Sequence, residues 1–264
     1  MGEFELIRRY FAAAPCAQGG AGVVLGIGDD CALLALPAGE QLVVSTDTLV
    51  AGVHFPDACD AFLLGQRALA VSASDLAAMG ATPLAFTLAL TLPSATEAWL
   101  AEFARGLQVM AQHCSLALVG GDTTRGPLSL TLTVFGRVPA GQALLRSGAQ
   151  VGDLLCVGGE LGDAAGALPL VLGQRDAAAD IREALLARYW SPQPQLALGQ
   201  ALRGRATAAL DISDGLLADC GHIARASQVA LEIELEQVPL SAALRAFAGE
   251  EQARLCALAG GDDY

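Results

Sequence analysis

Ser74-Asp75-Leu76-Ala77-Ala78-Met79-Gly80-Ala81 ends an apolar helix predicted over residues 61–79 and leads into a strand predicted over residues 84–92. In this strand, and in a second one over residues 128–138, Thr or Ser alternates with Leu, Val and Phe at period two. A short β-branched run predicts another strand over residues 41–46. The first part of the chain is therefore predicted to combine a substantial sheet with helices.

Further helices and strands extend this pattern. Residues 3–14 have helical spacing, and Ser94-Ala95-Thr96-Glu97 has the pattern of a capping box that starts a helix reaching about residue 113. The second part of the chain alternates strands, expected over residues 154–157, 207–212 and 229–236, with helices, expected over residues 163–172, 180–190, 194–203 and 215–226. The predicted fold class is mixed α/β (α+β), with an N-terminal domain over residues 1–140 and a C-terminal domain over residues 141–264.

Length and composition limit the class of protein. A chain of 264 residues favours two packed lobes. Although 53% of the residues are hydrophobic and the mean hydropathy is +0.47, no apolar run reaches the roughly 20 residues of a membrane-spanning helix. The net charge is −13 and the basic residues do not cluster, so nucleic acid is not an expected partner. The order of charges at the N-terminus is not that of a secretory signal, and a cytoplasmic location is expected.

The choice of basic and sulfur-containing residues excludes several chemistries. All 15 basic residues are arginine, and the absence of lysine removes Schiff-base chemistry, a Walker lysine and a lysine general base. The seven cysteines form no Cys-x-x-Cys pair and none lies beside a histidine at zinc spacing. We interpret them as small buried apolar residues.

Aspartates occur at five places where a solvated charge is not expected. Some follow a glycine turn, some lie at the end of a predicted strand, and one lies in an apolar helix. These are Gly26-Ile27-Gly28-Asp29-Asp30, Ser45-Thr46-Asp47-Thr48, Ser72-Ala73-Ser74-Asp75, Gly120-Gly121-Asp122-Thr123-Thr124 and Asp211-Ile212-Ser213-Asp214-Gly215. Carboxylate and hydroxyl oxygens suit a hard divalent cation, and Mg²⁺ characteristically combines few protein carboxylates with substrate phosphates. Without lysine, a bound nucleotide must be neutralised by metal ions, arginines, backbone amides and helix N-termini. The pattern therefore predicts an oxygen-rich site for a hard divalent cation such as Mg²⁺, provided that the fold brings these residues together.

Each motif alone also has a purely structural interpretation. Gly28-Asp29-Asp30 fits a turn with an Asx hydrogen bond, and Asp214 fits a helix N-cap. His54 fits a packed or surface histidine, and Gly158-Gly159-Glu160-Leu161-Gly162 fits a tight turn. Asp75 is harder to explain in this way, because a carboxylate on an apolar helix needs a partner if it is buried. The functional interpretation depends on the conjunction of the motifs.

The five aspartate motifs, together with Gly52-Val53-His54-Phe55 and the helix end at residues 74–81, resemble thiamine-monophosphate kinase. Their order and approximate spacing agree with that family over essentially the whole chain. The family shares its fold with aminoimidazole ribonucleotide synthetase and selenophosphate synthetase, so the resemblance implies the same two-lobe fold. It also implies a homodimer joined through the N-terminal sheets, with ATP in a groove between the lobes.

The same resemblance implies roles for individual residues. The ligands of several Mg²⁺ ions would be Asp30, Ser45, Thr46, Asp47, Asp75, Asp122, Asp211 and Asp214. The contacts with ATP would be made by Gly121, Asp122, Arg146 and Ser213. His54 and Asp262 would contact the thiamine phosphate, although the family pattern usually has Glu in place of Asp262, whose side chain is shorter by one methylene. The family pattern also continues beyond Tyr264 with an aromatic that packs on the thiamine ring, so a truncated C-terminal lobe is expected.

The expected reaction is direct in-line transfer of the γ-phosphoryl group of ATP to the phosphate of thiamine monophosphate. A phosphate monoester has a second pKa near roughly 6, so the acceptor is already a nucleophile at neutral pH and no residue is assigned as general base. Two alternatives stay open: another ATP-dependent enzyme of the same superfamily acting on a purine precursor, and a nucleotide-binding dimer module without turnover. Selenophosphate synthesis is disfavoured, because its reactive cysteine-lysine arrangement cannot be made without lysine.

Overall fold

The computed structural model describes residues 3–264, and the side chains of residues 5–264. It divides the chain into two compact units: unit 1 comprises Met1–Leu76 and Ala81–Ala143, and unit 2 comprises Ala77–Gly80 and Leu144–Tyr264. Met1 and Gly2, which enter the prediction about a secretory signal, lie outside the described residues. No helix within the described part of the chain is both long and apolar enough to cross a lipid bilayer.

Unit 1 is built on a four-stranded sheet with the strand order β3-β6-β4-β5, beside a two-stranded sheet β1-β2. The strands are β1 (Val23–Leu25), β2 (Leu33–Leu34), β3 (Glu40–Val50), β4 (Thr82–Leu92), β5 (Ala117–Arg125) and β6 (Ser129–Pro139). β6 pairs antiparallel with both β3 and β4, whereas β4 and β5 are parallel and are connected through a helix. The strands predicted over residues 84–92 and 128–138 are confirmed, and the strand predicted over residues 41–46 is longer than expected.

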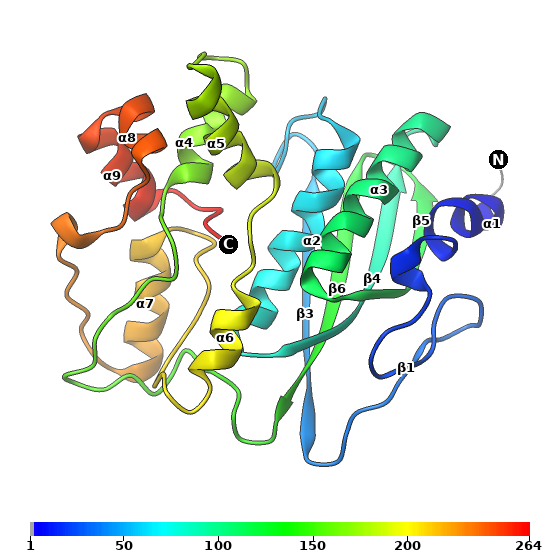
Figure 1. Cartoon of the computed structure of the whole chain (residues 1–264), viewed down its shortest axis with the longest axis horizontal. Helices are drawn as coiled ribbons and strands as arrows, with labels where there is room; N and C mark the ends of the chain where they lie inside the picture. The colour runs from blue at the N-terminus through cyan, green and yellow to red at the C-terminus, as the bar shows by residue number, and fades with distance from the viewer. Residues whose placement is uncertain (1–2) are drawn as a thin grey trace. The chain divides into compact units, whose positions relative to one another are not determined.

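The long helices of unit 1 are α2 (Ala61–Ala78) and α3 (Glu97–Cys114), which lie along one face of the sheet (Figure 1). Their packing surface is formed by alternate residues of the central strands, such as Phe86 and Leu132, which are fully buried. The two helices come close together at Gly106 of α3, where an added Cβ would lie 1.9 Å from the backbone oxygen of Phe62 in α2. Glycine is therefore required at this crossing.

The N-terminal segment of unit 1 is helical but not uniformly α-helical. It consists of α1 (Glu3–Leu6), a π-helix (Ile7–Ala12) and a 3₁₀-helix (Pro15–Ala17). The predicted capping box at residues 94–97 is wrong. The N-cap of α3 is Thr96, whose side chain makes no capping hydrogen bond, and Glu97 is the first helical residue instead of the third. The Glu97 carboxylate instead forms a paired contact with the guanidinium of Arg9, with both N–O distances 3.1 Å.

Unit 2 is formed by helices packed around a small apolar core. They are α4 (Asp163–Val171), α5 (Ala179–Trp190), α6 (Leu196–Leu202), α7 (Leu216–Ser227), a 3₁₀-helix (Leu235–Gln237), α8 (Ala242–Ala248) and α9 (Glu250–Ala259). Leu185 and Leu244 are completely buried. The bounds of α4, α5, α6 and α7 agree with the four helices predicted for this part of the sequence, within a few residues at each end.

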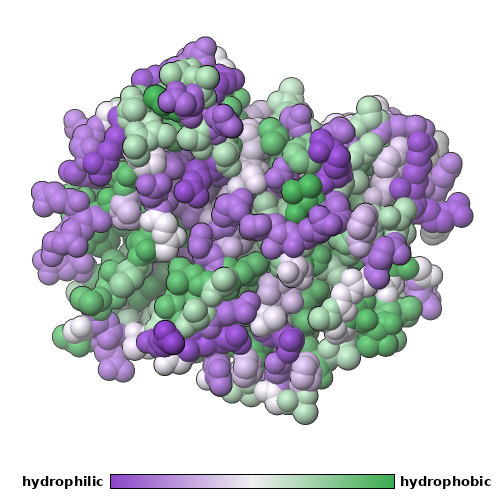
Figure 2. All heavy atoms as spheres, viewed as in Figure 1, coloured by the Kyte–Doolittle hydropathy of each residue, from purple (hydrophilic) through white to green (hydrophobic). Residues whose placement is uncertain are grey.

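The strands predicted over residues 154–157, 207–212 and 229–236 are wrong, since none of the described residues of unit 2 lies in a strand. A β-branched or alternating segment becomes a strand only when a neighbouring backbone supplies the ladder of hydrogen bonds. The first of these segments instead exposes apolar side chains, with Leu154 89% exposed, close to Val151 at 96%. Figure 2 shows hydrophobic side chains at the surface where the segment between β6 and α4 runs in Figure 1.

Candidate functional site

Two carboxylates come together in unit 1, one from the sheet and one from the helix that covers it. Ser45 and Asp47 lie two residues apart on β3 and therefore face α2, where Asp75 is located. The Ser45 hydroxyl donates a hydrogen bond to a carboxylate oxygen of Asp75. Burial raises the pKa of Asp47, the negative charge of Asp75 raises it further, and a hydrogen bond from Ser72 partly offsets both. A cation here would relieve the repulsion between the two carboxylates.

The neighbouring residue Thr46 lies on the opposite face of the same sheet. Its hydroxyl is 2.9 Å from that of Thr133, and the Thr48 hydroxyl is 2.8 Å from that of Thr131 in the next row. Asp122 belongs to the row of Thr48, because it pairs with Ala89, which in turn pairs with Thr131. The structure therefore brings Ser45, Asp47 and Asp75 together and places Thr46 and Asp122 on the other face of the sheet.

Gly121, the residue before Asp122, lies where a side chain would collide with the backbone of the neighbouring strand. A Cβ at this position would lie 2.0 Å from the backbone oxygen of Leu88 in β4, and the φ angle of Gly121 is +153°. This close approach of β5 to β4 follows an irregularity in the register of the two strands between Phe86 and Thr87. Asp122 itself pairs in regular register with Ala89 and is exposed.

His54 and Asp30 lie in loops of unit 1. The Nδ1 atom of His54 accepts a hydrogen bond from the backbone N–H of Val50 at 3.0 Å, so the neutral ring carries its proton on Nε2. This holds the histidine in the loop that directly follows β3. Asp30 is exposed, and its backbone N–H donates to the side chain of Asp29 at 3.0 Å. An Asx turn would join the Asp29 side chain to the backbone two residues later, so this bond to the next residue is not the one that the structural interpretation predicts. The Asp30 side chain lies at the surface.

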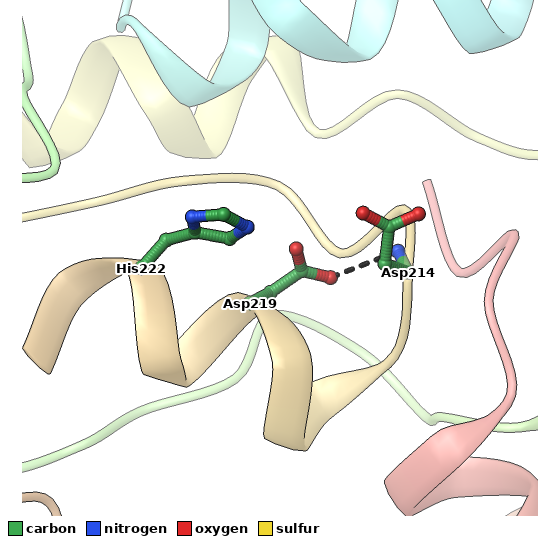
Figure 3. Close-up of side chains that lie close together, drawn as sticks. All are labelled: Asp214, Asp219 and His222. Atoms are coloured by element: carbon green, nitrogen blue, oxygen red, sulfur yellow. Dashed lines mark hydrogen bonds between the residues drawn. The ribbon is translucent and has the colours of Figure 1, made fainter. Parts of the chain in front are cut away.

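In unit 2, a carboxylate that the sequence did not single out organises the predicted Asp211–Asp214 motif. The Oδ2 atom of Asp219 accepts hydrogen bonds from the backbone N–H groups of both Ser213 and Asp214, each at 3.0 Å. Asp219 is 3% exposed, whereas the Asp214 side chain is exposed. Figure 3 shows the Asp219 carboxylate pointing to the Asp214 backbone, with His222 on its other side. Ligand atoms of these three residues all lie within 4.8 Å of one another.

The structural interpretation of Asp214 as a helix N-cap is wrong. The N-cap of α7 is Gly215, which has a φ angle of +106° and makes no side-chain capping bond. Asp219 and His222 carry a sequence signal of their own, because they lie three residues apart in the predicted helix and therefore on one face of it. A second carboxylate five residues after Asp214 is the other signal that points to this group.

The segment that carries Asp262 runs beside this motif. The backbone N–H of Asp262 donates to the carbonyl oxygen of Ser213 at 3.0 Å, and that of Asp263 donates to the carbonyl oxygen of Ile212 at 3.1 Å. Asp262 has a φ angle of +70°, a left-handed conformation that Asp tolerates better than most residues. Ser213, Asp214 and Asp262 are thus brought together within unit 2, with the half-buried Asp211 at the start of the same segment.

Arg146 lies in a different segment of unit 2. Its side chain is exposed, and its carbonyl oxygen accepts a hydrogen bond from the Ser227 hydroxyl at 3.2 Å. The same hydroxyl oxygen accepts hydrogen bonds from the backbone N–H groups of Gly148 and Ala149, both at 3.1 Å. The C-terminal end of α7 therefore fixes the backbone that presents Arg146, while the first turns of the same helix fix Ser213 and Asp214.

The residues in both units are chemically suited to a hard divalent cation. They offer carboxylate and hydroxyl oxygens, and the pair Asp47–Asp75 combines two negative charges in a half-buried position. The group in unit 2 also contains an imidazole, which suits Mg²⁺ less well than oxygen ligands do. On the chemistry of the donors, the Ser45–Asp47–Asp75 group fits Mg²⁺ better than the group around His222.

Comparison with known proteins places both halves of the chain in described families. Residues 28–138 match the model of the AIR synthase related protein N-terminal domain, and residues 150–262 match that of the C-terminal domain. Thiamine-monophosphate kinase of Escherichia coli (strain K12) is 50% identical over 265 residues, which cover 100% of this chain and 81% of the relative.

Two solved structures are similar in both sequence and fold. Thiamine-monophosphate kinase from Stenotrophomonas maltophilia K279a has a TM-score of 0.91 and 50% identity, covering 100% of this chain and 84% of its own. AaThiL complexed with AMPPCP and TMP has a TM-score of 0.81 and 30% identity, covering 87% of this chain and 75% of its own. The predicted mixed α/β fold with an N- and a C-terminal domain of this type is confirmed.

Proposed function

The chain belongs to the thiamine-monophosphate kinase family, and we propose that it transfers the γ-phosphoryl group of ATP to the phosphate of thiamine monophosphate, giving thiamine diphosphate and ADP. The observation that carries this proposal is the 50% identity with a thiamine-monophosphate kinase along the whole length of the chain. The complex of AaThiL with AMPPCP and TMP supports ATP as the donor, because AMPPCP is an analogue of ATP with a non-hydrolysable β,γ linkage.

We propose that the residues identified by the aspartate motifs carry the reaction. In unit 1, Ser45, Asp47 and Asp75, which the structure brings together, would hold Mg²⁺. Thr46 and Asp122, on the other face of the sheet, and Asp30, in a loop, would be further metal ligands. In unit 2, Asp211 and Asp214 would contribute further metal ligands. Gly121, Asp122, Arg146 and Ser213 would contact ATP, while His54 and Asp262 would contact thiamine monophosphate.

The main obstacle to the reaction is repulsion between two anions, since a phosphate must attack a triphosphate. Bound Mg²⁺ would neutralise part of this charge. The chain itself contributes orientation: the Ser213 backbone is fixed from both sides, and the exposed guanidinium of Arg146 is available for contact with a phosphate. The acceptor phosphate needs no proton removed from it at neutral pH, so the reaction requires positioning of charged groups and no general base.

We also propose that the chain acts as a homodimer that pairs through the sheet of unit 1. β3 is an edge strand of the described four-stranded sheet, and its outward side chains Leu42 and Val44 are about half exposed. An exposed apolar edge strand favours pairing with another strand. Val44→Lys should shift the molar mass measured by light scattering from that of a dimer to that of a monomer. A wild-type monomer would contradict the proposal.

The function is tested by measuring ADP release from Mg²⁺ and ATP with and without thiamine monophosphate, and by identifying thiamine diphosphate as the product. Release that depends on thiamine monophosphate is expected. Release that is stimulated instead by an aminoimidazole-pathway substrate would assign the chain a different acceptor. If the chain binds nucleotide but releases no ADP with either acceptor, its function would be nucleotide binding without turnover.

A further inference from the structure

Asp219 is a buried carboxylate at the start of α7 that lies outside the residues assigned to the reaction. Only 3% of it is exposed, and a buried carboxylate is costly unless hydrogen bonds compensate for lost hydration. The backbone N–H groups of Ser213 and Asp214 provide this compensation, both pointing at the single oxygen Oδ2.

These bonds determine how the Ser213–Asp214 turn is presented. Both amide groups face α7, whereas the carbonyl oxygen of Ser213 accepts the hydrogen bond from the Asp262 backbone on another side. The peptide between Ile212 and Asp214 is thus held at several points and cannot rotate without breaking them. Figure 3 shows the consequence, because the Asp214 carboxylate is turned away from α7 while Asp219 stays beneath the turn.

We propose that Asp219 is a positioning residue for nucleotide binding, which acts by holding the Ser213–Asp214 turn in the orientation that presents the Ser213 hydroxyl and the Asp214 carboxylate to a metal-bound triphosphate. This inference rests on the proposed function, because it takes Ser213 and Asp214 as nucleotide and metal contacts. The essential feature of Asp219 is an acceptor oxygen at the correct place. Its negative charge and any direct ligation of a cation are secondary.

Three substitutions separate these possibilities. Asp219→Ala removes the acceptor, Asp219→Asn keeps an oxygen at the same distance without the charge, and Asp219→Glu keeps the charge but moves it by one methylene. Affinity for AMPPCP in the presence of Mg²⁺ is measured by calorimetry. We expect Asp219→Ala to weaken binding by about 10- to 100-fold, the usual effect of losing a group that orients a ligand, and Asp219→Asn to bind more tightly than Asp219→Glu.

A matched control measures the effect of destabilisation alone. Ser241 is a buried residue of unit 2 whose hydroxyl oxygen accepts the backbone N–H of Leu244 at 2.9 Å, so Ser241→Ala also removes a backbone-capping acceptor. We expect Ser241→Ala to lower Tm while leaving the affinity for AMPPCP near that of the wild type. In steady state, Asp219→Ala should raise KM for ATP far more than KM for thiamine monophosphate, which a general loss of stability would not do.

The outcomes that overturn the inference are specific. Wild-type affinity in Asp219→Ala would show that the turn does not need this residue. Affinity in Asp219→Glu equal to or above that in Asp219→Asn would show that charge or direct ligation matters more than placement, and this comparison remains valid if Asp219→Ala does not fold. Because AMPPCP binding requires no acceptor, a wild type that binds it without turnover would contradict the proposed function and leave this test intact.

Discussion

The side-chain carboxylate of Asp263 accepts the backbone N–H of Gly162 with both of its oxygens, at 2.9 Å to Oδ1 and 2.8 Å to Oδ2. This contact joins the segment that carries Asp262 to the N-terminus of α4, where the glycine-rich turn at residues 158–162 ends. Gly162 has a φ angle of +85°, and a Cβ there would lie 2.5 Å from the backbone nitrogen of Ala257. The glycine-rich turn therefore has a structural role in seating α4 against α9 and Asp263.

The Asp263 carboxylate is expected to make stability depend on pH. The pKa of Asp263 is raised to about 7, and burial is the largest cause. The charges of Asp163 and Asp262 also raise it, whereas the Gly162 hydrogen bond and Arg188 lower it. Because the unperturbed value is 3.8, the folded state holds this proton more tightly than the unfolded state does. The stability from this group is therefore fully present below about pH 4 and is lost as the pH rises through about 7.

Asp263→Asn removes this titration and keeps an oxygen that can accept the Gly162 N–H. Between about pH 4 and pH 8, the free energy of unfolding of the wild type should fall relative to that of the variant by roughly 2–4 kcal/mol. Urea unfolding at each pH measures this difference. Asp153→Asn is a control for which the opposite pH dependence of the free energy of unfolding is expected, because hydrogen bonds from Thr207 and the Gln150 backbone lower the pKa of Asp153. A difference independent of pH for Asp263→Asn would contradict the prediction.

Asp75→Asn should separate stability from metal binding in unit 1. Loss of the Asp75 charge lowers the pKa of Asp47 and relieves the repulsion between two half-buried carboxylates. Without Mg²⁺, we expect the variant to be more stable than the wild type by roughly 1 kcal/mol. Added Mg²⁺ should raise Tm of the wild type more than that of the variant, because a cation that binds only the folded state stabilises it by mass action.

The measurement is a thermal unfolding series at increasing MgCl₂ concentration, with NaCl at matched ionic strength as the control for screening. An equal rise of Tm in wild type and variant would show that Mg²⁺ binds elsewhere. A variant that is less stable than the wild type in the absence of metal would show that the Ser45–Asp75 hydrogen bond outweighs the repulsion.

The sequence predicts unit 1 well because its strands and helices carry their own signals. The alternation over residues 84–92 and 128–138 requires one buried face, and the buried side chains of Phe86 and Leu132 meet that requirement. The failures come from contacts that a local pattern does not contain. The pattern at residues 94–97 predicts a capping box, whereas Glu97 pairs with Arg9, which is 88 residues away. The three predicted strands of unit 2 have suitable composition but lack ladder partners.

For the candidate site too, the sequence predicts what depends on local patterns and misses what depends on contacts between distant residues. The motifs identify which aspartates to consider, but they do not say which of them meet. Adjacent residues on a strand face opposite sides of the sheet, so Thr46 and Asp47 in one motif have different neighbours. The importance of Asp219 depends on the direction of two backbone N–H groups, which a sequence pattern does not reveal.

Asp122→Asn should abolish most of the activity without affecting the fold. Asp122 is exposed on β5, so the isosteric amide can be accommodated, and the loss of one charged group that stabilises the transition state typically lowers turnover by roughly 100-fold or more. Glu97→Gln is the matched control: it removes an exposed carboxylate of the same unit, whose ion pair with Arg9 contributes little. Acceptor-dependent ADP release at saturating Mg²⁺ measures both, with Tm recorded in parallel. Near-normal turnover in Asp122→Asn would remove this residue from the proposed metal and ATP contacts.

Gly106→Ala should destabilise unit 1 through the crossing of α2 and α3. The new methyl group would lie 1.9 Å from the backbone oxygen of Phe62, and no side-chain rotation can relieve a contact with the backbone of a helix. Overpacking of this kind costs about 1–3 kcal/mol.

Gly26→Ala is the control, because the nearest neighbour of its new methyl group would be the Ala17 backbone oxygen at 3.9 Å and the φ angle of Gly26 is not in the left-handed region. Urea unfolding should show a lower midpoint for Gly106→Ala and a midpoint near the wild-type value for Gly26→Ala. Equal midpoints for the two variants would mean that the helices separate at little cost, and Asp75, which α2 carries, would then be held less firmly than the structure indicates.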